Sequence, residues 1–151
     1  MKRALIAIED IDRDRALLER ARAFAFSERI DLVVVALATP GEYEEVEETL
    51  DAIGRVEHTH YDEHDVLEGI SGDVDDMAND VLGSSVDYEL ETVVAERSNQ
   101  ATTLLEIADR SGCDHVFVPG TSRSPTGKAV FGDRTQDVIL GFDGFVTVSM
   151  E

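Results

Sequence analysis

Short apolar segments that alternate with amphipathic ones constrain the fold of this chain most strongly. Near-continuous apolar runs such as DLVVVALA are typical of strands that are buried on both faces of a parallel sheet. The stretches between them carry apolar residues at helical spacing. Strands that alternate with helices predict a doubly wound α/β fold, with a five-stranded parallel sheet in the order 3-2-1-4-5 and helices on both faces. The expected strands are 4–8, 31–38, 88–95, 115–118 and 145–150.

The predicted helices and their caps follow from the residues that flank these strands. Asp12 is expected to cap a helix over 12–29, and Ser98 to cap one that ends before Gly112. Pro40 begins an acidic helix, and a further helix is expected over 73–82. Residues 54–71 are polar and rich in histidine, without a clean period, which predicts an irregular insertion. The 151 residues are therefore expected to form one domain, 1–151.

The charge balance excludes several classes of partner. Thirty-three acidic residues stand against thirteen basic ones, only two of them lysine, for a net charge of −20. Such a chain has no basic patch for nucleic acid or for an anionic membrane surface. Salt screens the repulsion among these acidic side chains, so the composition favours a protein from the cytoplasm of a halophile. The alternative is an acidic protein of a mesophile.

The remaining compositional features favour the cytoplasm. No apolar run approaches the roughly 20 residues that span a bilayer. Acidic residues interrupt the first apolar run, which predicts a strand and not a signal peptide. The single cysteine, Cys113, is expected to be a buried structural thiol in a reducing compartment.

The segment 118–136, VPGTSRSPTGKAVFGDRTQ, is the strongest candidate for a binding loop. In a sheet of the predicted order, ligands bind at the carboxyl ends of the first and fourth strands, where the strand order reverses. Glu9 follows the first strand, and Gly120 follows the fourth. The loop ends at Gly132, before a helix whose N-terminus favours anions. A plain connection remains possible, but a dozen residues exceed the usual two to six.

This loop is not a Walker P-loop. That motif places four residues between its two glycines and a hydroxyl after its lysine. Here six residues separate Gly120 from Gly127, and Ala129 follows Lys128. The sequence also offers no later strand for a second magnesium ligand.

The order of elements and the glycine loop resemble the universal stress protein family over essentially the whole chain. In its ATP-binding branch an aspartate ends the first strand, and the loop reads Gly, two residues, Gly, nine residues, Gly, then Ser or Thr. Glu9 occupies the aspartate position, and Gly120 and Gly132 match the first and last glycines. The resemblance implies an adenine-nucleotide α-hydrolase-like fold and a regulatory ATP site, with Mg as a possible companion. The implied nucleotide-binding residues are Ala7, Glu9, Gly120, Arg123, Gly127, Lys128, Gly132, Asp133 and Thr135, with Glu9 on the ribose or base.

The chain departs from the family pattern at three places. Arg123 stands at the second glycine, only eight residues separate it from Gly132, and Asp133 replaces the Ser or Thr. Asp133 would repel phosphate or cap the helix itself, whereas Arg123, Lys128 and Arg134 supply cations. Two functions therefore remain open: ATP binding, or a dimeric interaction module with a degenerate site. The resemblance also implies a homodimer through the C-terminal strand, whose exposed edge a partner would cover.

Other residue clusters give weaker predictions. His58, His60, Asp62 and His64 would share one face of an extended segment and could ligate a metal, but such clusters are usually solvated. No nucleophile, base and orienting residue are evident, so no catalytic residue is predicted and ATP hydrolysis would at most be slow. An enzyme of the wider α-hydrolase-like group would need a substrate domain that 151 residues do not provide.

Overall fold

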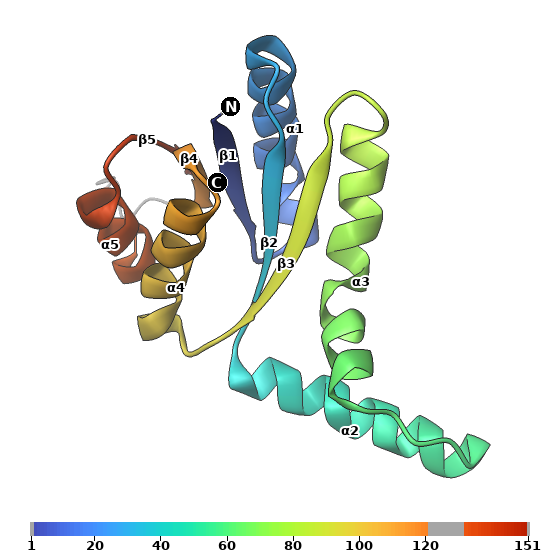
Figure 1. Ribbon diagram of the computed structural model, residues 1–151. Helices are drawn as coiled ribbons and strands as arrows, with labels where there is room; N and C mark the ends of the chain where they lie inside the picture. The colour runs from blue at the N-terminus through green and yellow to red at the C-terminus, as the bar shows by residue number, and fades with distance from the viewer. Residues whose placement is uncertain (1, 121–131, 151) are drawn as a thin grey trace.

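A five-stranded parallel sheet forms the centre of the molecule (Figure 1). The computed structural model describes residues 2–120 and 132–150. The strands lie in the order β3-β2-β1-β4-β5, so the predicted α/β fold and its strand order are confirmed. Their bounds are β1 Arg3–Ile8, β2 Leu32–Ala38, β3 Tyr88–Val94, β4 Cys113–Pro119 and β5 Phe145–Ser149.

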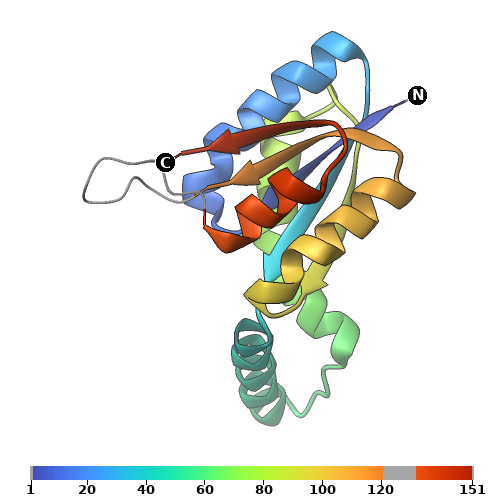
Figure 2. The same cartoon turned by 90° about the vertical axis from the view of Figure 1, so that its left-hand side faces the viewer.

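Helices cover both faces of the sheet and give two separate cores. One core packs α1 (Ile11–Glu28) and α3 (Glu63–Leu82) against the sheet, and the other packs α4 (Arg97–Arg110) and α5 (Asp133–Gly141). In Figure 2, α4 and α5 lie toward the viewer, beside β4 and β5. Alternate side chains of β1 enter the two cores, and all from Ala4 to Ile8 are buried. This double burial explains the continuous apolar runs in the sequence.

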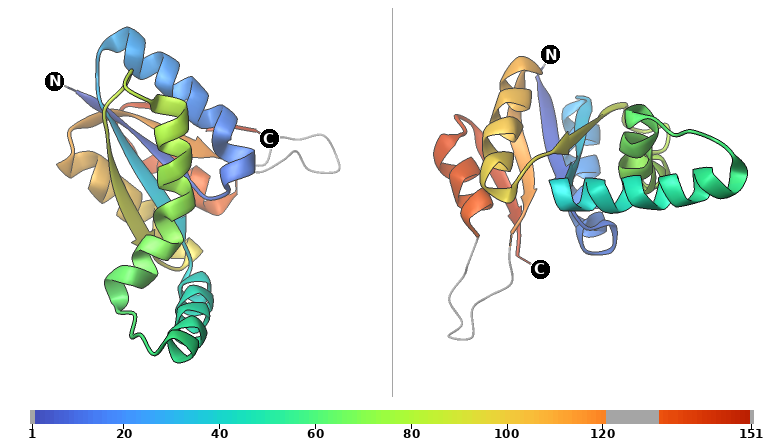
Figure 3. Two further views of the ribbon diagram at one scale, coloured as in Figure 1. Left: turned by 90° about the vertical axis from the view of Figure 1, so that its right-hand side faces the viewer. Right: turned by 90° about the horizontal axis from the view of Figure 1, so that it is seen from below.

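The prediction of an irregular insertion over 54–71 is wrong, because two helices occupy most of it. Helix α2 spans Pro40–Glu57 and ends where His58 adopts a left-handed φ of 57°. Helix α3 begins after Asp62, which forms a capping box with Asp65. Figure 3 shows α2 and the first turns of α3 extending beyond the sheet. Little of this arm is buried, so its sequence lacks the apolar period that identifies a core helix.

Two predicted helix caps are also corrected. Asp10, not Asp12, caps α1, and its carboxylate accepts from the amides of Asp12 and Arg13. These bonds, with the one from Arg13 as the largest cause, lower the pKa of Asp10. Ser98 lies inside α4, which begins after Glu96 without a side-chain cap. Both helices therefore begin closer to the preceding strand than the apolar spacing indicates.

The chemical state of Cys113 agrees with a structural thiol. Cys113 is the first residue of β4 and is half-buried. The pKa of this thiol is raised to about 11, and burial is the largest cause of the increase. The thiolate that would act as a nucleophile is therefore scarce at neutral pH.

A helix that crosses a membrane needs about 20 predominantly apolar residues. Among the helices of the described residues, none is both long and apolar enough to do so.

Candidate functional site

A cleft of about 920 Å³ opens at the carboxyl ends of β1 and β4, beside the N-termini of α4 and α5. The strand order reverses between these two strands, so this is the place where open α/β sheets bind ligands. The cleft is lined by Glu9, Arg13, Arg97, Ser98, Pro119, Gly120, Gly132, Asp133, Arg134, Thr135, Gln136 and Asp137.

Three arginines gather around the carboxylate of Glu9, the residue that follows β1. One oxygen, Oε2, pairs with Nη1 of Arg134. The other, Oε1, lies 3.4 Å from Nη2 of Arg97 and 3.7 Å from Nη2 of Arg13. The arginines come from α5, α4 and α1, and the side chain of Glu9 is only 18% exposed. Glu9 alone therefore offsets only one of the three arginine charges.

Gln100 fixes the position of Arg134. Nη1 of Arg134 donates to Oε1 of Gln100 over 2.9 Å, and Nε2 of Gln100 donates to the carbonyl oxygen of Ala95 over 2.9 Å. Gln100 is buried, so its amide must find partners within the protein. The chain of bonds holds the guanidinium of Arg134 at the side of the cleft, since both ends of the Gln100 amide are engaged.

Asp14 supports the other side of the cleft from beneath. It is fully buried, and its Oδ2 accepts from the backbone amides of Glu9 at 2.9 Å and Asp10 at 3.0 Å. Its Oδ1 lies 2.8 Å from Nε of Arg13, and this hydrogen bond is the largest cause that raises the pKa of Arg13. Asp14 thus positions both the backbone of Glu9 and the guanidinium of Arg13.

The N-terminus of α5 opens into the cleft. Gly132 precedes the helix with a φ of 80°, a conformation that favours glycine. No side chain of the described residues caps this end, so Asp133 does not seal it as a cap; instead it is exposed and lines the cleft. The backbone amides of the first turn are suited to an anion, as at other helix N-termini.

Gly120 and Thr135 hold the helix and the strand ends together. A Cβ on Gly120 would lie 2.7 Å from the carbonyl oxygen of Ser149, which accepts from the Gly120 amide over 2.7 Å. Glycine is therefore required here for close packing. The hydroxyl of the buried Thr135 donates to the carbonyl oxygen of Pro119 over 2.8 Å. That hydroxyl is engaged within the protein.

The structure brings together five of the residues implied by the resemblance: Glu9, Gly120, Gly132, Asp133 and Thr135. Ala7 lies elsewhere, buried in the core beneath α4. Arg123, Gly127 and Lys128 lie outside the described residues.

Sequence reasoning missed several residues of the cleft. Arg13 lies one helical turn after Glu9. Arg97 comes three residues after the end of the third strand, whose carboxyl end meets the same edge of the sheet. These positions were a usable signal for both arginines. The sequence gives no comparable signal for Gln100, whose role depends on its burial.

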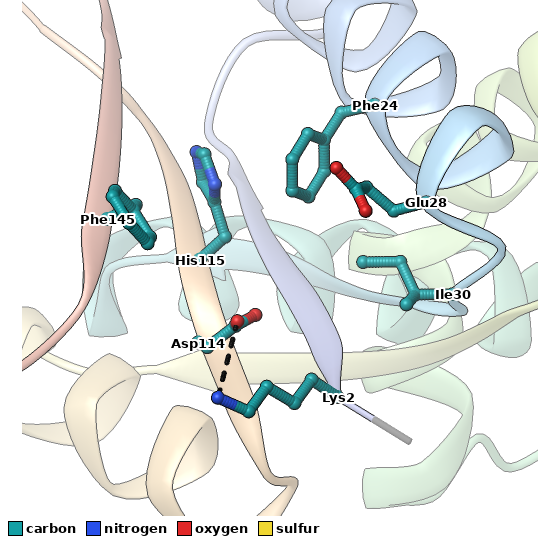
Figure 4. A pocket seen from close by; sticks show the side chains of 7 residues that line it. All are labelled: Lys2, Phe24, Glu28, Ile30, Asp114, His115 and Phe145. Carbon is teal, nitrogen blue, oxygen red and sulfur yellow. Dashed lines mark ion pairs between the residues drawn. The ribbon is translucent and has the colours of Figure 1, made fainter.

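A second pocket, of about 400 Å³, lies at the opposite end of β4 (Figure 4). Its aromatic wall includes Phe24, His115 and Phe145, and Lys2 pairs with Asp114 at its rim over 3.8 Å. Burial, the largest cause, lowers the pKa of His115, whose Nε2 lies 2.8 Å from the hydroxyl of Thr147. His115 therefore joins β4 to β5 as a largely neutral side chain.

The predicted cluster of His58, His60, Asp62 and His64 is divided between helix ends. His58 ends α2, Asp62 caps α3, and His64 pairs with Glu68 over 3.0 Å. Among the described residues, no group of three or more potential ligands is arranged to hold a metal ion. The extended segment on which that alternative depended is not formed.

Comparisons with known proteins agree with this architecture. The model of the universal stress protein family matches residues 1–148. No curated protein matches the sequence. Among solved structures, the universal stress protein from Archaeoglobus fulgidus is 20% identical, with a TM-score of 0.66 and 98% of each chain covered.

Two further structures extend the likeness in fold. The universal stress protein UspA from Lactobacillus plantarum is 16% identical, with a TM-score of 0.66, 97% of this chain covered and 96% of that one. The Archaeoglobus fulgidus protein in complex with dAMP is 15% identical, with a TM-score of 0.61, 98% of this chain covered and 97% of that one. At these identities the likeness concerns the fold alone. The family model, which matches nearly the whole sequence, shows that this chain belongs to the universal stress protein family.

Proposed function

We propose that this protein is a regulatory protein that binds an adenine nucleotide, ATP, in the cleft between β1, β4 and α5. The observation that carries this proposal is the gathering of Arg13, Arg97 and Arg134 beside an uncapped helix N-terminus. Guanidinium groups and helix amides are the groups that bind phosphate in proteins. Structures of family members in complex with dAMP and with cAMP support the choice of an adenine nucleotide.

The phosphate end of the ligand would lie toward α5 and the arginines. Gly132 lets the backbone approach closely, and Arg134 is held in place by Gln100. Arg123, Gly127 and Lys128 would complete the phosphate contacts, as the family resemblance implies. Magnesium would accompany ATP as its bound counter-ion, and Asp133, which lines the cleft, would supply a carboxylate to it.

The affinity for AMP, ADP and ATP tests this proposal. Because the cations and the helix N-terminus act on phosphates, affinity should increase from AMP to ATP by about 10-fold or more. Equilibrium dialysis with each nucleotide, with and without magnesium, measures it. GTP serves as the control for base recognition. Equal affinity for the three adenine nucleotides would contradict phosphate binding by the arginines.

A second function, a dimeric interaction module without nucleotide, has one observation in its favour. Glu9 already neutralises part of the arginine charge, and Asp133 and Asp137 add negative charge to the lining. If the wild-type protein binds no nucleotide and Asp133→Ser gains binding, Asp133 is what closes the site. If neither binds, the cleft is a structural remnant.

We further propose a homodimer that forms through β5. This strand lies at one edge of the sheet and pairs with β4. Its first residue, Phe145, is 69% exposed, which is unusual for an aromatic side chain. An edge strand of this kind is a template for pairing with another chain. Light scattering should give a mass twice that of the 16.6 kDa chain, and a mass of one chain would contradict the proposal.

We also propose that the protein is adapted to the cytoplasm of a salt-rich cell. Its net charge of −20 means that the acidic side chains repel one another strongly at low ionic strength. Raising KCl from about 0.1 M to about 2 M should therefore raise the melting temperature by roughly 10 °C, because screening removes that repulsion. Circular dichroism measures the transition. A melting temperature that does not change with KCl would contradict the adaptation.

A further inference from the structure

The carboxylate of Glu9 lies beside the three arginines, where an anionic ligand would also bind. Both of its carboxylate oxygens contact arginines: Oε2 pairs with Arg134, and Oε1 lies within ion-pair distance of Arg97 and Arg13. A phosphate that enters the cleft meets the same guanidinium groups. In the structure these cations are thus already engaged by a negative charge that belongs to the protein.

The three arginines differ in how freely they can change partner. Arg13 also binds the buried Asp14 through two hydrogen bonds, so it is held in place. Arg97 is 65% exposed, and its 3.4 Å contact with Glu9 is long. Arg134 is 13% exposed, and its Nη1 also donates to Oε1 of Gln100, a hydrogen bond that does not involve Glu9. Arg97 and Arg134 are therefore the two that can transfer from Glu9 to a ligand.

We propose that Glu9 is an internal counter-anion that competes with ligand phosphate for Arg97 and Arg134 and so sets the ligand charge that the cleft accepts. This inference deepens the nucleotide-binding proposal and rests on it for the identity of the natural ligand. Without a bound polyphosphate, Glu9 pairs with Arg134 and neutralises it. When a polyphosphate binds, its oxygens replace those of Glu9 on the two transferable arginines.

The competition has a defined dependence on ligand charge. The Glu9 carboxylate repels each phosphate charge that enters, while the arginines it releases attract that charge. Removing the negative charge of Glu9 removes the repulsion and leaves the cations available. The gain in affinity should therefore increase with the number of phosphates and should be absent for an uncharged ligand.

This role has the opposite sign to the one that the family resemblance implies. A carboxylate that accepts hydrogen bonds from ribose hydroxyls or from the base favours the ligand, and its loss weakens adenosine and ATP alike. A competing carboxylate disfavours the ligand, and its loss strengthens binding of phosphates only. One substitution therefore separates the two roles.

The test is Glu9→Gln, which keeps the shape of the side chain and removes its charge. Inorganic tripolyphosphate, phosphate and adenosine are titrated into the wild type and the variant by calorimetry at one moderate KCl concentration. We expect Glu9→Gln to bind tripolyphosphate about 10-fold more tightly than the wild type, phosphate about 2-fold more tightly, and adenosine no more tightly. Glu91→Gln is the matched control, since it removes one charge from β3 beside Arg110, outside the cleft lining.

Each result decides the inference. Equal or weaker binding of tripolyphosphate by Glu9→Gln would overturn it, as would an equal gain in Glu91→Gln, which would indicate a general effect of net charge. Tripolyphosphate does not require a base-binding subsite. A wild type that fails to bind ATP while Glu9→Gln gains tripolyphosphate would contradict the nucleotide proposal and leave the counter-anion supported.

Discussion

Replacing Gly132 by valine should reduce the affinity for ATP by about 100-fold or more. Gly132 has a φ of 80° directly before α5, a conformation that costs a β-branched residue on the order of 1–3 kcal/mol. The helix N-terminus would therefore shift, and its amides would no longer be placed to bind the phosphates of a nucleotide in the proposed site. A competition assay against a fluorescent ATP analogue measures the loss.

Gly112→Val supplies the control for this variant. Gly112 has a similar φ of 70°, but it precedes β4 at the end of the strand opposite the cleft. Both variants carry the same backbone strain and should be destabilised similarly, whereas only Gly132→Val should lose ATP. Undiminished binding in Gly132→Val would show that the nucleotide does not contact the start of α5.

Replacing Asp14 by alanine should destabilise the fold by about 3 kcal/mol. The variant leaves the amides of Glu9 and Asp10, whose hydrogen bonds are partly buried, without their acceptor, and an unsatisfied donor costs up to roughly 1–3 kcal/mol when it is buried. It also removes the buried partner of the Arg13 guanidinium. Since domains of this size are stable by only about 5–15 kcal/mol, the change is large. Urea unfolding in KCl measures it.

Asp12→Ala is the matched control for Asp14→Ala. It removes one carboxylate from the same turn of α1, but Asp12 is exposed. Its effect should stay within about 0.5 kcal/mol. Equal unfolding midpoints for the two variants would contradict the structural role of Asp14.

The sheet was predictable because burial on two faces leaves a strong signal. The run of β2 is apolar at every position and that of β1 at every position after Arg3, and right-handed crossovers then restrict the strand order. In the arm formed by α2 and early α3, the helix that begins at Pro40 was predicted, but the helical turns within 54–71 were not. Its helices are defined by two capping boxes, at Thr39 and Asp62, and by the contact of Gly69 with Val46, not by burial in a core.

The location of the candidate site was also predicted, but two of its three arginines, Arg13 and Arg97, were not. The rule for strand ends places Glu9, Gly120 and Gly132 at one edge of the sheet, and the structure brings these residues into one cleft. The positions of Arg97 and Gln100 depend on where α4 begins. The predicted cap at Ser98 placed that start too late. Asp14 was missed because a carboxylate in an amphipathic helix is usually solvated, and only the structure reveals the amides it accepts from.

A calorimetric titration of Mg-ATP into the wild-type protein in molar KCl tests the central claim most directly. High salt suppresses the self-repulsion, so the folded protein is the species titrated. The account predicts saturable binding of one nucleotide per chain with a dissociation constant on the order of micromolar. The account would be contradicted if about 1 mM ATP, a concentration at which a micromolar site is saturated, gave no heat of binding and no thermal shift. In that case the cleft between Glu9 and α5 does not bind the nucleotide.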